Sequence, residues 1–257
     1  MFTPLFTLVR TIVVTLTAAV ATATLGPTVM LARLFRVPQG PHSIYTRCIR
    51  AWARSINRAA GVTIRVHGAE HLRNDNGAVY ISNHVSWFDI FPLAATVPWC
   101  SFVAKTEIRR IPVFGFAAEA VGIVFLDRDN RKQAFKSYEK AATVVREGRG
   151  IVVCPEGTRG RDYHLRPFKK GPFVLAIASQ SPIIPTVVHG AREVMPKGSF
   201  WIKPGVVDLH FLPPVPTEGF DYDHRAELMT VVWEQMAAQL REAYGVTTSE
   251  HAVANQV

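Results

Sequence analysis

The sequence predicts an α/β fold, in which helices flank a central, mostly parallel sheet and a membrane-associated helical element precedes it. From residue 61 onward, short runs of β-branched and aromatic residues alternate with segments of helical period. This alternation is the mark of a largely parallel α/β sheet. Hydrophobic residues make up 48% of the 257 positions, which is enough to form a sizeable core.

The N-terminal segment is strongly apolar. No charged residue lies between Arg10 and Arg33, and this length is close to the ~20 residues that cross a bilayer. We expect Gly26-Pro27 to break the segment, so a helical hairpin within one leaflet competes with a spanning helix. A cleaved leader is the third alternative, because Ala21-Thr22-Ala23 resembles a cleavage site. Membrane association is therefore predicted, with the topology left open.

Residues 42–60 have helical period and a basic face, formed by Arg47, Arg50, Arg54 and Arg58. The opposing face is roughly apolar, with Ile44, Cys48, Trp52, Ile56 and Ala59. This pattern is typical of an amphipathic helix that lies on anionic headgroups. The alternative is an ordinary solvated face. Residues 1–60 are thus predicted to be a membrane-anchoring segment and a basic amphipathic helix.

Residues 61–246 are predicted to form the α/β domain, and 247–257 a disordered tail. Strands are expected at 62–67, 78–82, 101–104, 121–126, 151–154 and 183–188, the last interrupted by Pro185. A hairpin over 200–211 is expected to turn at Lys203-Pro204-Gly205. Helices are expected at 87–96, 131–147 and 173–178, with a final amphipathic helix capped by Asp223.

The formal net charge of +9 implies an anionic partner. No RNA-reading signature or zinc-finger spacing is visible, so we expect no nucleic acid and favour anionic headgroups or a phosphorylated substrate. Cys48, Cys100 and Cys154 form no C-x-x-C pair, which favours reduced thiols in the cytosol. The histidines show no metal-ligand spacing, so we expect no catalytic metal.

The stretch from Ala78 to Asp89 starts as a strand and ends in a polar turn. Ser86 is a natural N-cap and Asp89 falls at the third helical position, the arrangement of a capping box. His84 would then lie in the loop before the helix, with the Asp89 carboxylate pointing back to it. A carboxylate on one ring nitrogen leaves the other nitrogen basic, which suits a general base. The alternative is a structural histidine beside a capping aspartate.

Four polar residues each follow directly after a predicted strand: His84, Lys105, Arg128 and Glu156. In open α/β sheets, ligands bind outside the carboxyl ends of the strands. If these strands are parallel, all four side chains converge on one edge of the sheet.

These motifs resemble those of the glycerophospholipid acyltransferase family, and most closely its 1-acylglycerol-3-phosphate acyltransferases. The resemblance covers roughly residues 62–190 and rests on four blocks in order. They are Asn83-His84-Val85-Ser86-Trp87-Phe88-Asp89, Gly122-Ile123-Val124-Phe125-Leu126-Asp127-Arg128, Pro155-Glu156-Gly157-Thr158-Arg159 and Pro182-Ile183-Ile184-Pro185. One His-x₄-Asp match is weak, whereas four blocks in sequence are specific. Cys154 departs from the family, which usually has an aromatic residue there.

The resemblance implies that His84 removes the proton of the acceptor hydroxyl while Asp89 orients it. The oxygen then attacks the thioester of acyl-CoA or acyl carrier protein directly, without an acyl-enzyme or cofactor. Backbone amides after His84 are expected to hold the oxyanion. The glycerol phosphate would be held by Glu156, Gly157, Thr158 and Arg159, with Arg128 and Lys105 as further cations. A surface ion pair is the alternative for Lys105, and a structural acceptor of backbone amides is the alternative for Glu156.

The function implied is acylation of the 2-hydroxyl of 1-acylglycerol-3-phosphate (lysophosphatidate) to give phosphatidate. We expect the enzyme at the inner membrane, with its active site facing the cytoplasm. Two alternatives remain. The same chemistry could act on another lysolipid, in phospholipid remodelling or on an amino-acid lipid, or the chain could be a non-catalytic protein that binds anionic lipid.

Overall fold

The structure is a computed structural model that describes residues 4–73, 77–127 and 131–248. Within them, one seven-stranded sheet has the order β1-β7-β6-β2-β5-β3-β4. Its strands are β1 Val62–His67, β2 Val79–Ser82, β3 Cys100–Lys105, β4 Val124–Leu126, β5 Gly150–Val153, β6 Ile183–His189 and β7 Gly205–Phe211. The helices are α1 Pro4–Leu34, α2 Ile44–Ala60, α3 Ile90–Thr96, α4 Phe114–Ala120, α5 Arg131–Arg146, α6 Gly171–Ser179, α7 Ala191–Val194 and α8 Arg225–Tyr244. Three short 3₁₀ turns are η1 Ala69–His71, η2 Trp87–Asp89 and η3 Thr106–Arg110.

The predicted parallel sheet is confirmed. Strands β2, β3, β4, β5 and β6 pair in parallel, while β6 and β7 are antiparallel and β1 runs parallel to β7. Parallel strands are buried on both faces and read as continuous apolar runs. The central strand β2 fits this rule, because all four of its residues are buried between β5 and β6.

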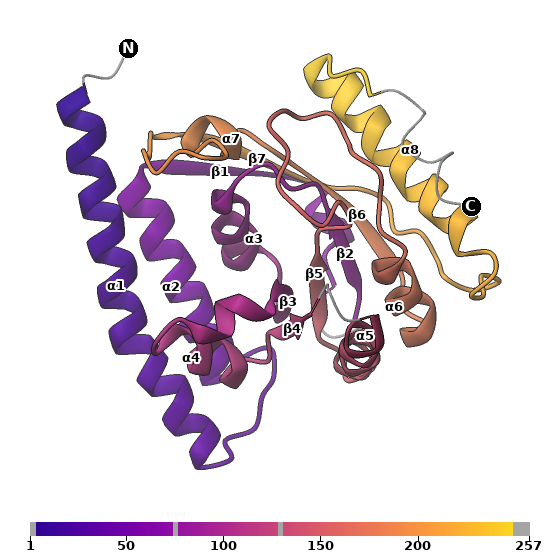
Figure 1. Cartoon of the computed structure of the whole chain (residues 1–257), viewed down its shortest axis with the longest axis horizontal. Helices are drawn as coiled ribbons and strands as arrows, with labels where there is room; N and C mark the ends of the chain where they lie inside the picture. Colours follow the sequence, from indigo (N-terminus) through magenta and orange to yellow (C-terminus); the bar gives the residue numbers. More distant parts are fainter. Residues whose placement is uncertain (1–3, 74–76, 128–130, 249–257) are drawn as a thin grey trace.

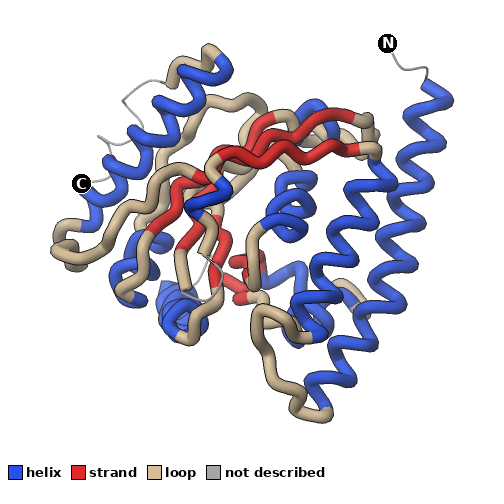
Figure 2. Tube along the Cα trace, turned by 180° about the vertical axis from the view of Figure 1, so that it is seen from behind, coloured by secondary structure: helices blue, strands red, loops and turns tan. Residues whose placement is uncertain are grey.

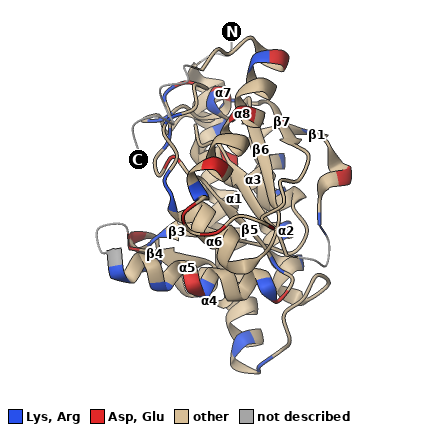
Figure 3. Cartoon of the chain, turned by 90° about the vertical axis from the view of Figure 1, so that its right-hand side faces the viewer, with Lys and Arg blue, Asp and Glu red and all other residues tan. Residues whose placement is uncertain are grey.

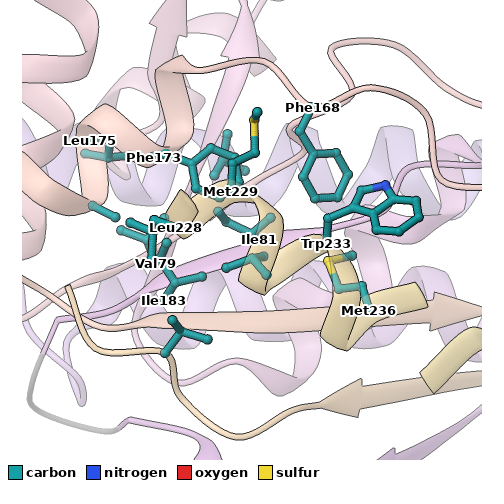
Figure 4. Close-up of a cluster of buried hydrophobic side chains, with 14 of the residues drawn as sticks. Val79, Ile81, Phe168, Phe173, Leu175, Ile183, Leu228, Met229, Trp233 and Met236 are labelled. Atoms are coloured by element: carbon teal, nitrogen blue, oxygen red, sulfur yellow. The ribbon is translucent and has the colours of Figure 1, made fainter. Parts of the chain in front are cut away.

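Helices cover both faces of the sheet (Figure 1). Successive side chains of a strand point to opposite faces, and β2 shows this directly. Val79 and Ile81 pack into the cluster under α5, α6 and α8, where Figure 4 shows them beside Phe173 and Leu228. Tyr80 instead packs with side chains of α2 and α3 on the other face. Two clusters therefore sandwich the sheet.

Helix α1 is continuous, so the expected break at Gly26-Pro27 is wrong, and a hairpin broken there is excluded. Pro27 lies inside the helix, where it removes one backbone hydrogen bond. Gly26 fits closely against α4, since a Cβ there would lie 3.1 Å from Val113 Cγ1. Along its length α1 contacts the rest of the fold: Thr22 Oγ1 accepts the indole N–H of Trp52 at 3.0 Å. Figure 2 shows α1 and α2 side by side.

One face of α1 remains uncovered and apolar. The exposed large hydrophobic residues on it are Leu5, Leu8, Val9, Ile12, Val13, Leu16, Val20, Leu31 and Leu34. Among the described helices, α1 alone is long and apolar enough to cross a membrane by length and composition, and only 6% of its most apolar window is buried. Phe116 of α4, 66% exposed, and Phe35 add to the exposed apolar side chains in this part of the chain.

Helix α2 lies between α1 and the rest of the fold. Ser43 caps it by accepting the backbone N–H of Thr46, so the helix begins two residues after the predicted start. Most of its predicted apolar face packs against protein, because Ile56 is fully buried and the Trp52 ring packs at a tilt against that of Phe91, with centroids 5.2 Å apart. Of the predicted basic face, Arg47, Arg54 and Arg58 are exposed whereas Arg50 is half-buried. Only the arginine side of α2 is therefore free for headgroups.

The predicted hairpin over 200–211 is wrong. Gly205 starts β7, whose parallel partner is β1, with Gly205 opposite Val62. The backbone N–H of Ile202 bonds instead to Thr11 Oγ1 of α1 at 3.0 Å. The sequence pattern showed a turn but not that the preceding residues would pair with a helix.

Smaller corrections concern strand and helix ends. Pro185 does not interrupt β6, because it lies within the strand opposite Ile81. The β4 strand is shorter than predicted, since residues 121–123 follow α4 in a turn. Asp221, and not Asp223, bonds the backbone at the start of α8, accepting the N–H of His224 at 3.0 Å. The predicted tail residues 249–257 lie outside the described part of the chain.

Candidate active site

The His84 side chain follows β2 and is held by a buried carboxylate. Its Nδ1 lies 2.7 Å from Oδ2 of Asp89, whose side chain is fully buried while that of His84 is 21% exposed. The predicted capping box is present, with Ser86 Oγ accepting the N–H of Phe88 at 2.9 Å. The carboxylate on Nδ1 leaves Nε2 as the nitrogen able to accept a proton.

Asp89 holds more than the imidazole. Its Oδ2 also accepts the backbone N–H groups of Val85 and Ser86, both at 2.9 Å. These are amides that we expected to stabilise an oxyanion, and that expectation is wrong for both of them. The same oxygen of Asp89 already accepts both N–H groups, so this turn of the chain holds the His84–Asp89 pair in place.

Glu156 binds the same loop from the other side. The backbone N–H of His84 donates to Glu156 Oε1 at 3.1 Å, and Arg166 Nε donates to Glu156 Oε2 at 2.8 Å. Both carboxylate oxygens therefore have protein donors. This geometry matches the structural alternative stated for Glu156, and a carboxylate engaged in this way does not favour a phosphate ligand.

The pKa of Glu156 is subject to two opposing effects, burial and a neighbouring cation. Its side chain is 2% exposed, and burial raises the pKa of this carboxyl above its ordinary value. The Arg166 guanidinium and the His84 N–H act in the opposite direction and lower the pKa. The ionised carboxylate thus depends on these donors.

The loop after β5 also holds the carbonyl of His84. The N–H of Gly160 donates to this carbonyl at 2.7 Å, so the loop contacts both polar atoms of the His84 backbone. Gly157 in this loop has a φ of +75°, a backbone conformation that favours glycine. Thr158, which follows it, is exposed.

Arg159 lies beside the histidine loop. Its guanidinium carbon is 5.4 Å from the ring centroid of Trp87, the residue that begins η2. Its backbone carbonyl accepts Lys197 Nζ at 2.7 Å. An arginine that contacts an aromatic ring in this way can still donate hydrogen bonds to an anion.

Lys105 ends β3 and is exposed. It lines a cleft of about 410 Å³ with Arg110, Leu126, Asp127 and Gly157, a volume within the ~300–1,000 Å³ range of small-molecule sites. Lys105 and the loop after β5 therefore meet at the carboxyl edge of the sheet, as predicted. The fourth residue of that prediction, Arg128, lies outside the described residues.

Two residues that support the site were not recognised as candidates in the sequence. Asn83 exchanges two hydrogen bonds with the backbone of Val188, at 2.7 and 3.0 Å, and so joins the end of β2 to β6. Arg166 binds Glu156. The signal for Arg166 was its position in a basic stretch ten residues after Glu156, but partner choice depends on the path of the loop.

Comparison with known proteins shows the family of this chain. A model described as Acyltransferase matches residues 63–189. The 1-acyl-sn-glycerol-3-phosphate acyltransferase of Limnanthes douglasii is 35% identical over 165 residues, which is 63% of this chain and 58% of the plant protein. The human 1-acyl-sn-glycerol-3-phosphate acyltransferase alpha is 31% identical over 198 residues, 76% of this chain and 70% of the human protein.

A solved structure shares the whole architecture. The 1-acyl-sn-glycerophosphate (LPA) acyltransferase PlsC from Thermotoga maritima has a TM-score of 0.79 at 26% identity, covering 94% of this chain and 98% of that one. The fold is thus that of an acyltransferase with an α/β sheet and N-terminal helices. The chain belongs to the acyltransferase family. It spans 58% of the length of the Limnanthes douglasii relative.

Proposed function

We propose that this protein is a 1-acylglycerol-3-phosphate O-acyltransferase, which esterifies the 2-hydroxyl of lysophosphatidate to give phosphatidate. The observation that carries the proposal is the 2.7 Å contact between His84 Nδ1 and Asp89 Oδ2, beside the loop on which Arg159 lies over the Trp87 ring. The plant and human relatives carry the name of this activity, which supports the choice of acceptor.

In the proposed reaction, His84 Nε2 takes the proton of the 2-hydroxyl as its oxygen attacks the thioester carbonyl. Asp89 keeps its charge and stabilises the imidazolium, which the buried contact with Nδ1 favours. Collapse of the tetrahedral intermediate breaks the carbon–sulfur bond, and the imidazolium returns the proton to the leaving thiolate. A thioester is already an activated acyl donor, so the proposed reaction requires no acyl-enzyme, metal or organic cofactor.

The acceptor phosphate is proposed to bind Arg159, with Gly157 and Thr158 of the same loop. A planar guanidinium can give two parallel hydrogen bonds to a phosphate. Lys105 would add a charge across the cleft that it shares with Gly157. Arg128 remains proposed as a further cation on the basis of its motif. Glu156 would act through the His84 backbone instead of touching the phosphate.

The donor is proposed to be acyl-CoA or acyl carrier protein, which both present an anionic phosphopantetheine thioester. Supporting this, Lys132, Lys136 and Lys140 are exposed at four-residue steps along α5, and Figure 3 shows basic residues along this helix. The cleft is lined by Leu126 and Asp127, at the end of β4, and α5 begins four residues after Asp127 in the sequence. A basic surface there would attract either donor.

The acceptor and the product are lipids, and the uncovered apolar face of α1 supports membrane association. The exposed arginines of α2 would contact anionic headgroups. We propose the inner membrane with the active site facing the cytoplasm, where thiols stay reduced, and all three cysteines are free.

A substrate panel tests the proposal. Purified enzyme is given lysophosphatidate, lysophosphatidylcholine or lyso-ornithine lipid, each with one acyl-CoA and then with one acyl carrier protein thioester. The proposal predicts the highest kcat/KM with lysophosphatidate and an acylated product at position 2. Preference for another lysolipid would support the alternative acceptor, and transfer to none would support a lipid-binding protein.

A further inference from the structure

Arg166 belongs to the basic stretch of residues 166–171, which the proposed reaction does not use. Its Nε donates to Glu156 Oε2 at 2.8 Å. The other oxygen of this carboxylate accepts the backbone N–H of His84 at 3.1 Å. One buried carboxylate therefore connects the Arg166 guanidinium to the peptide that carries the base.

We propose that Arg166 is a positioning residue for acyl transfer. Its guanidinium fixes Glu156, Glu156 fixes the His84 backbone, and the imidazole is thereby aimed at the acceptor hydroxyl. The inference rests on the function proposed above and extends it to a residue that touches neither substrate.

The geometry around His84 explains why its backbone needs a second support. Asp89 fixes the imidazole through Nδ1, but the peptide that carries the side chain can still move unless it is held separately. Glu156 accepts its N–H, and Gly160 donates to its carbonyl at 2.7 Å. A shift of ~1 Å at a reacting group can cost ~10²-fold in rate, so a loosened peptide lowers turnover.

Arg166 is needed because Glu156 is buried. The groups that face this carboxyl are the Arg166 guanidinium and the N–H and imidazole of His84, and they reduce but do not cancel the rise in pKa that burial causes. Loss of the guanidinium charge would raise the pKa of Glu156 further. The carboxyl would then be protonated at a pH where the native enzyme keeps a carboxylate on the His84 N–H.

Direct phosphate binding is the competing role for Arg166, because its side chain is 32% exposed. The orientation of the guanidinium favours positioning, since Nε points to Glu156. Nη2 is buried and has no hydrogen-bond partner among the described residues. Nε is therefore engaged by Glu156 and Nη2 is shielded from solvent, and Arg166 does not line the cleft that Lys105 shares with Gly157.

The test uses four variants of the full chain: Arg166→Met, Arg166→Lys, Glu156→Gln and the Arg166→Met/Glu156→Gln double variant. Arg161→Met is the matched control, an exposed arginine on the same loop. For each we would measure kcat, the KM of lysophosphatidate and of acyl-CoA, the pH profile of kcat, and amide hydrogen exchange over residues 83–88.

We expect Arg166→Met to lower kcat by roughly ten- to a hundredfold, with both KM values within about twofold of native. The acid limb of its pH profile should move to higher pH, and residues 83–88 should exchange faster. Arg166→Lys should restore part of kcat and of the acid limb, because it keeps the charge. In the Glu156→Gln background, Arg166→Met should cost little more, because both residues act through one contact.

Three kinetic results would each overturn the inference, and one hydrogen-exchange result would do so independently of activity. The kinetic results are a native kcat in Arg166→Met, a large rise in the lysophosphatidate KM at constant kcat, or fully additive losses in the double variant. The native enzyme and His84→Ala are assayed alongside. An inactive native enzyme refutes the proposed function, whereas unchanged exchange over residues 83–88 in Arg166→Met refutes the role of Arg166 independently of activity.

Discussion

The backbone N–H of His84 donates to Glu156 Oε1 at 3.1 Å across a separation of 72 residues. Asp89 holds the imidazole of the same residue at 2.7 Å. Glu156 thus fixes the peptide of His84, and Asp89 fixes its ring. Their removal should therefore have different consequences from removal of the imidazole itself.

The first prediction contrasts His84→Ala with Asp89→Ala. Loss of the base should lower kcat by about 10²–10⁴-fold, the usual contribution of a group that transfers the proton. The half-buried imidazole carries little of the packing, so His84→Ala should unfold near the native Tm. Asp89→Ala leaves the N–H groups of Val85 and Ser86 without an acceptor, at ~1–3 kcal/mol each.

Steady-state kinetics and thermal unfolding of both variants check this contrast. Asp89→Asn is the control, because it keeps one carbonyl oxygen at the site and should unfold between the native protein and Asp89→Ala. Substantial turnover in His84→Ala would refute its assignment as the base. Equal loss of stability in His84→Ala and Asp89→Ala would show that the carboxylate does not organise the loop.

The second prediction concerns Arg159 and its contact with Trp87. Arg159→Ala should raise the lysophosphatidate KM by roughly ten- to a hundredfold, because a charge-assisted hydrogen bond contributes ~1.5–3 kcal/mol. The acyl-CoA KM should change little. Trp87→Leu should raise the acceptor KM by only about two- to fivefold, since an exposed cation–π contact contributes ~0.5–1 kcal/mol.

Trp201→Leu serves as the control for Trp87→Leu, because Trp201 is a comparably exposed tryptophan, at 52% against 46%. Initial rates over a matrix of the two substrates separate their KM values. Equal effects of Arg159→Ala on both KM values would count against a role in holding the acceptor phosphate.

Much of the fold was accessible from the sequence, because the strands and helices of a parallel α/β sheet each have a local hydrophobic pattern. The strands that carry His84, Lys105 and Glu156 were predicted within one or two residues. The hairpin failed for a different reason. Residues 200–202 look strand-like, but Ile202 bonds to Thr11, almost two hundred positions away, and no local signal reports such a partner.

For the candidate site, the contact between His84 and Asp89 was predictable, since the capping box places both residues within one turn. The role of Glu156 was not, because a carboxylate in a phosphate-binding motif can serve either the ligand or the backbone. Which of the two Glu156 serves depends on its hydrogen bond with Arg166. The position of Arg166 depends in turn on the path of the loop after β5, which is held to His84 by the N–H of Gly160. The capping geometry has a second consequence that the sequence motif does not reveal. An aspartate that accepts amide N–H groups makes those groups unavailable to an oxyanion.

The third prediction is that the uncovered face of α1 binds bilayers. Leu16 and Val20 are 59% and 62% exposed on this helix. A Leu16→Lys/Val20→Lys variant should lose at least tenfold in binding to neutral phosphatidylcholine vesicles. Lysine at the centre of a membrane helix costs ~2.5–3.5 kcal/mol, and the native apolar contact is lost as well. Vesicle co-sedimentation of the full chain measures the effect.

The control for this prediction adds the same two charges elsewhere. Val231→Lys/Ala243→Lys places them on exposed positions of α8, which lies on the opposite side of the molecule from α1 (Figure 1). This variant should bind neutral vesicles like the native chain. Equal losses in the two variants would mean that charge alone, and not the face of α1, weakens binding.

A series of packed aromatic rings connects the loop after β5 to the end of α8, and it contains two histidines whose pKa values are lowered. His189 lies between Tyr163 and Tyr244, with ring centroids 4.2 and 3.6 Å away. His210 Nε2 lies 2.6 Å from the Tyr244 hydroxyl, and its ring stacks on His67 at 4.3 Å. Burial lowers the pKa of both His189 and His210 below 6.5, against the raising effect of nearby Asp208.

The sign of the pH dependence follows from these lowered values. The unfolded chain binds more protons than the folded chain once the pH falls below the ordinary histidine pKa of 6.5. The stability from neutral His189 and His210 is therefore complete above pH 6.5 and is lost as the pH falls through their folded-state pKa values. Glu156 acts oppositely nearer pH 4.5, because its raised pKa favours the protonated folded form.

The fourth prediction is that His189→Phe flattens this dependence. Phenylalanine keeps a ring between Tyr163 and Tyr244 but cannot bind a proton, so the free energy of unfolding should fall less than in the native protein between pH 6.5 and 5. Denaturant unfolding at pH 7.5, 6.5, 5.5 and 5.0 measures the difference. Comparison with the native protein cancels the contribution of Glu156, which both proteins share.

The control for this prediction is His42→Gln, at an exposed position, which should retain the native dependence of the unfolding free energy on pH. If the free energy of unfolding of His189→Phe depends on pH as steeply as that of the native protein, the protonation of His189 is not coupled to folding.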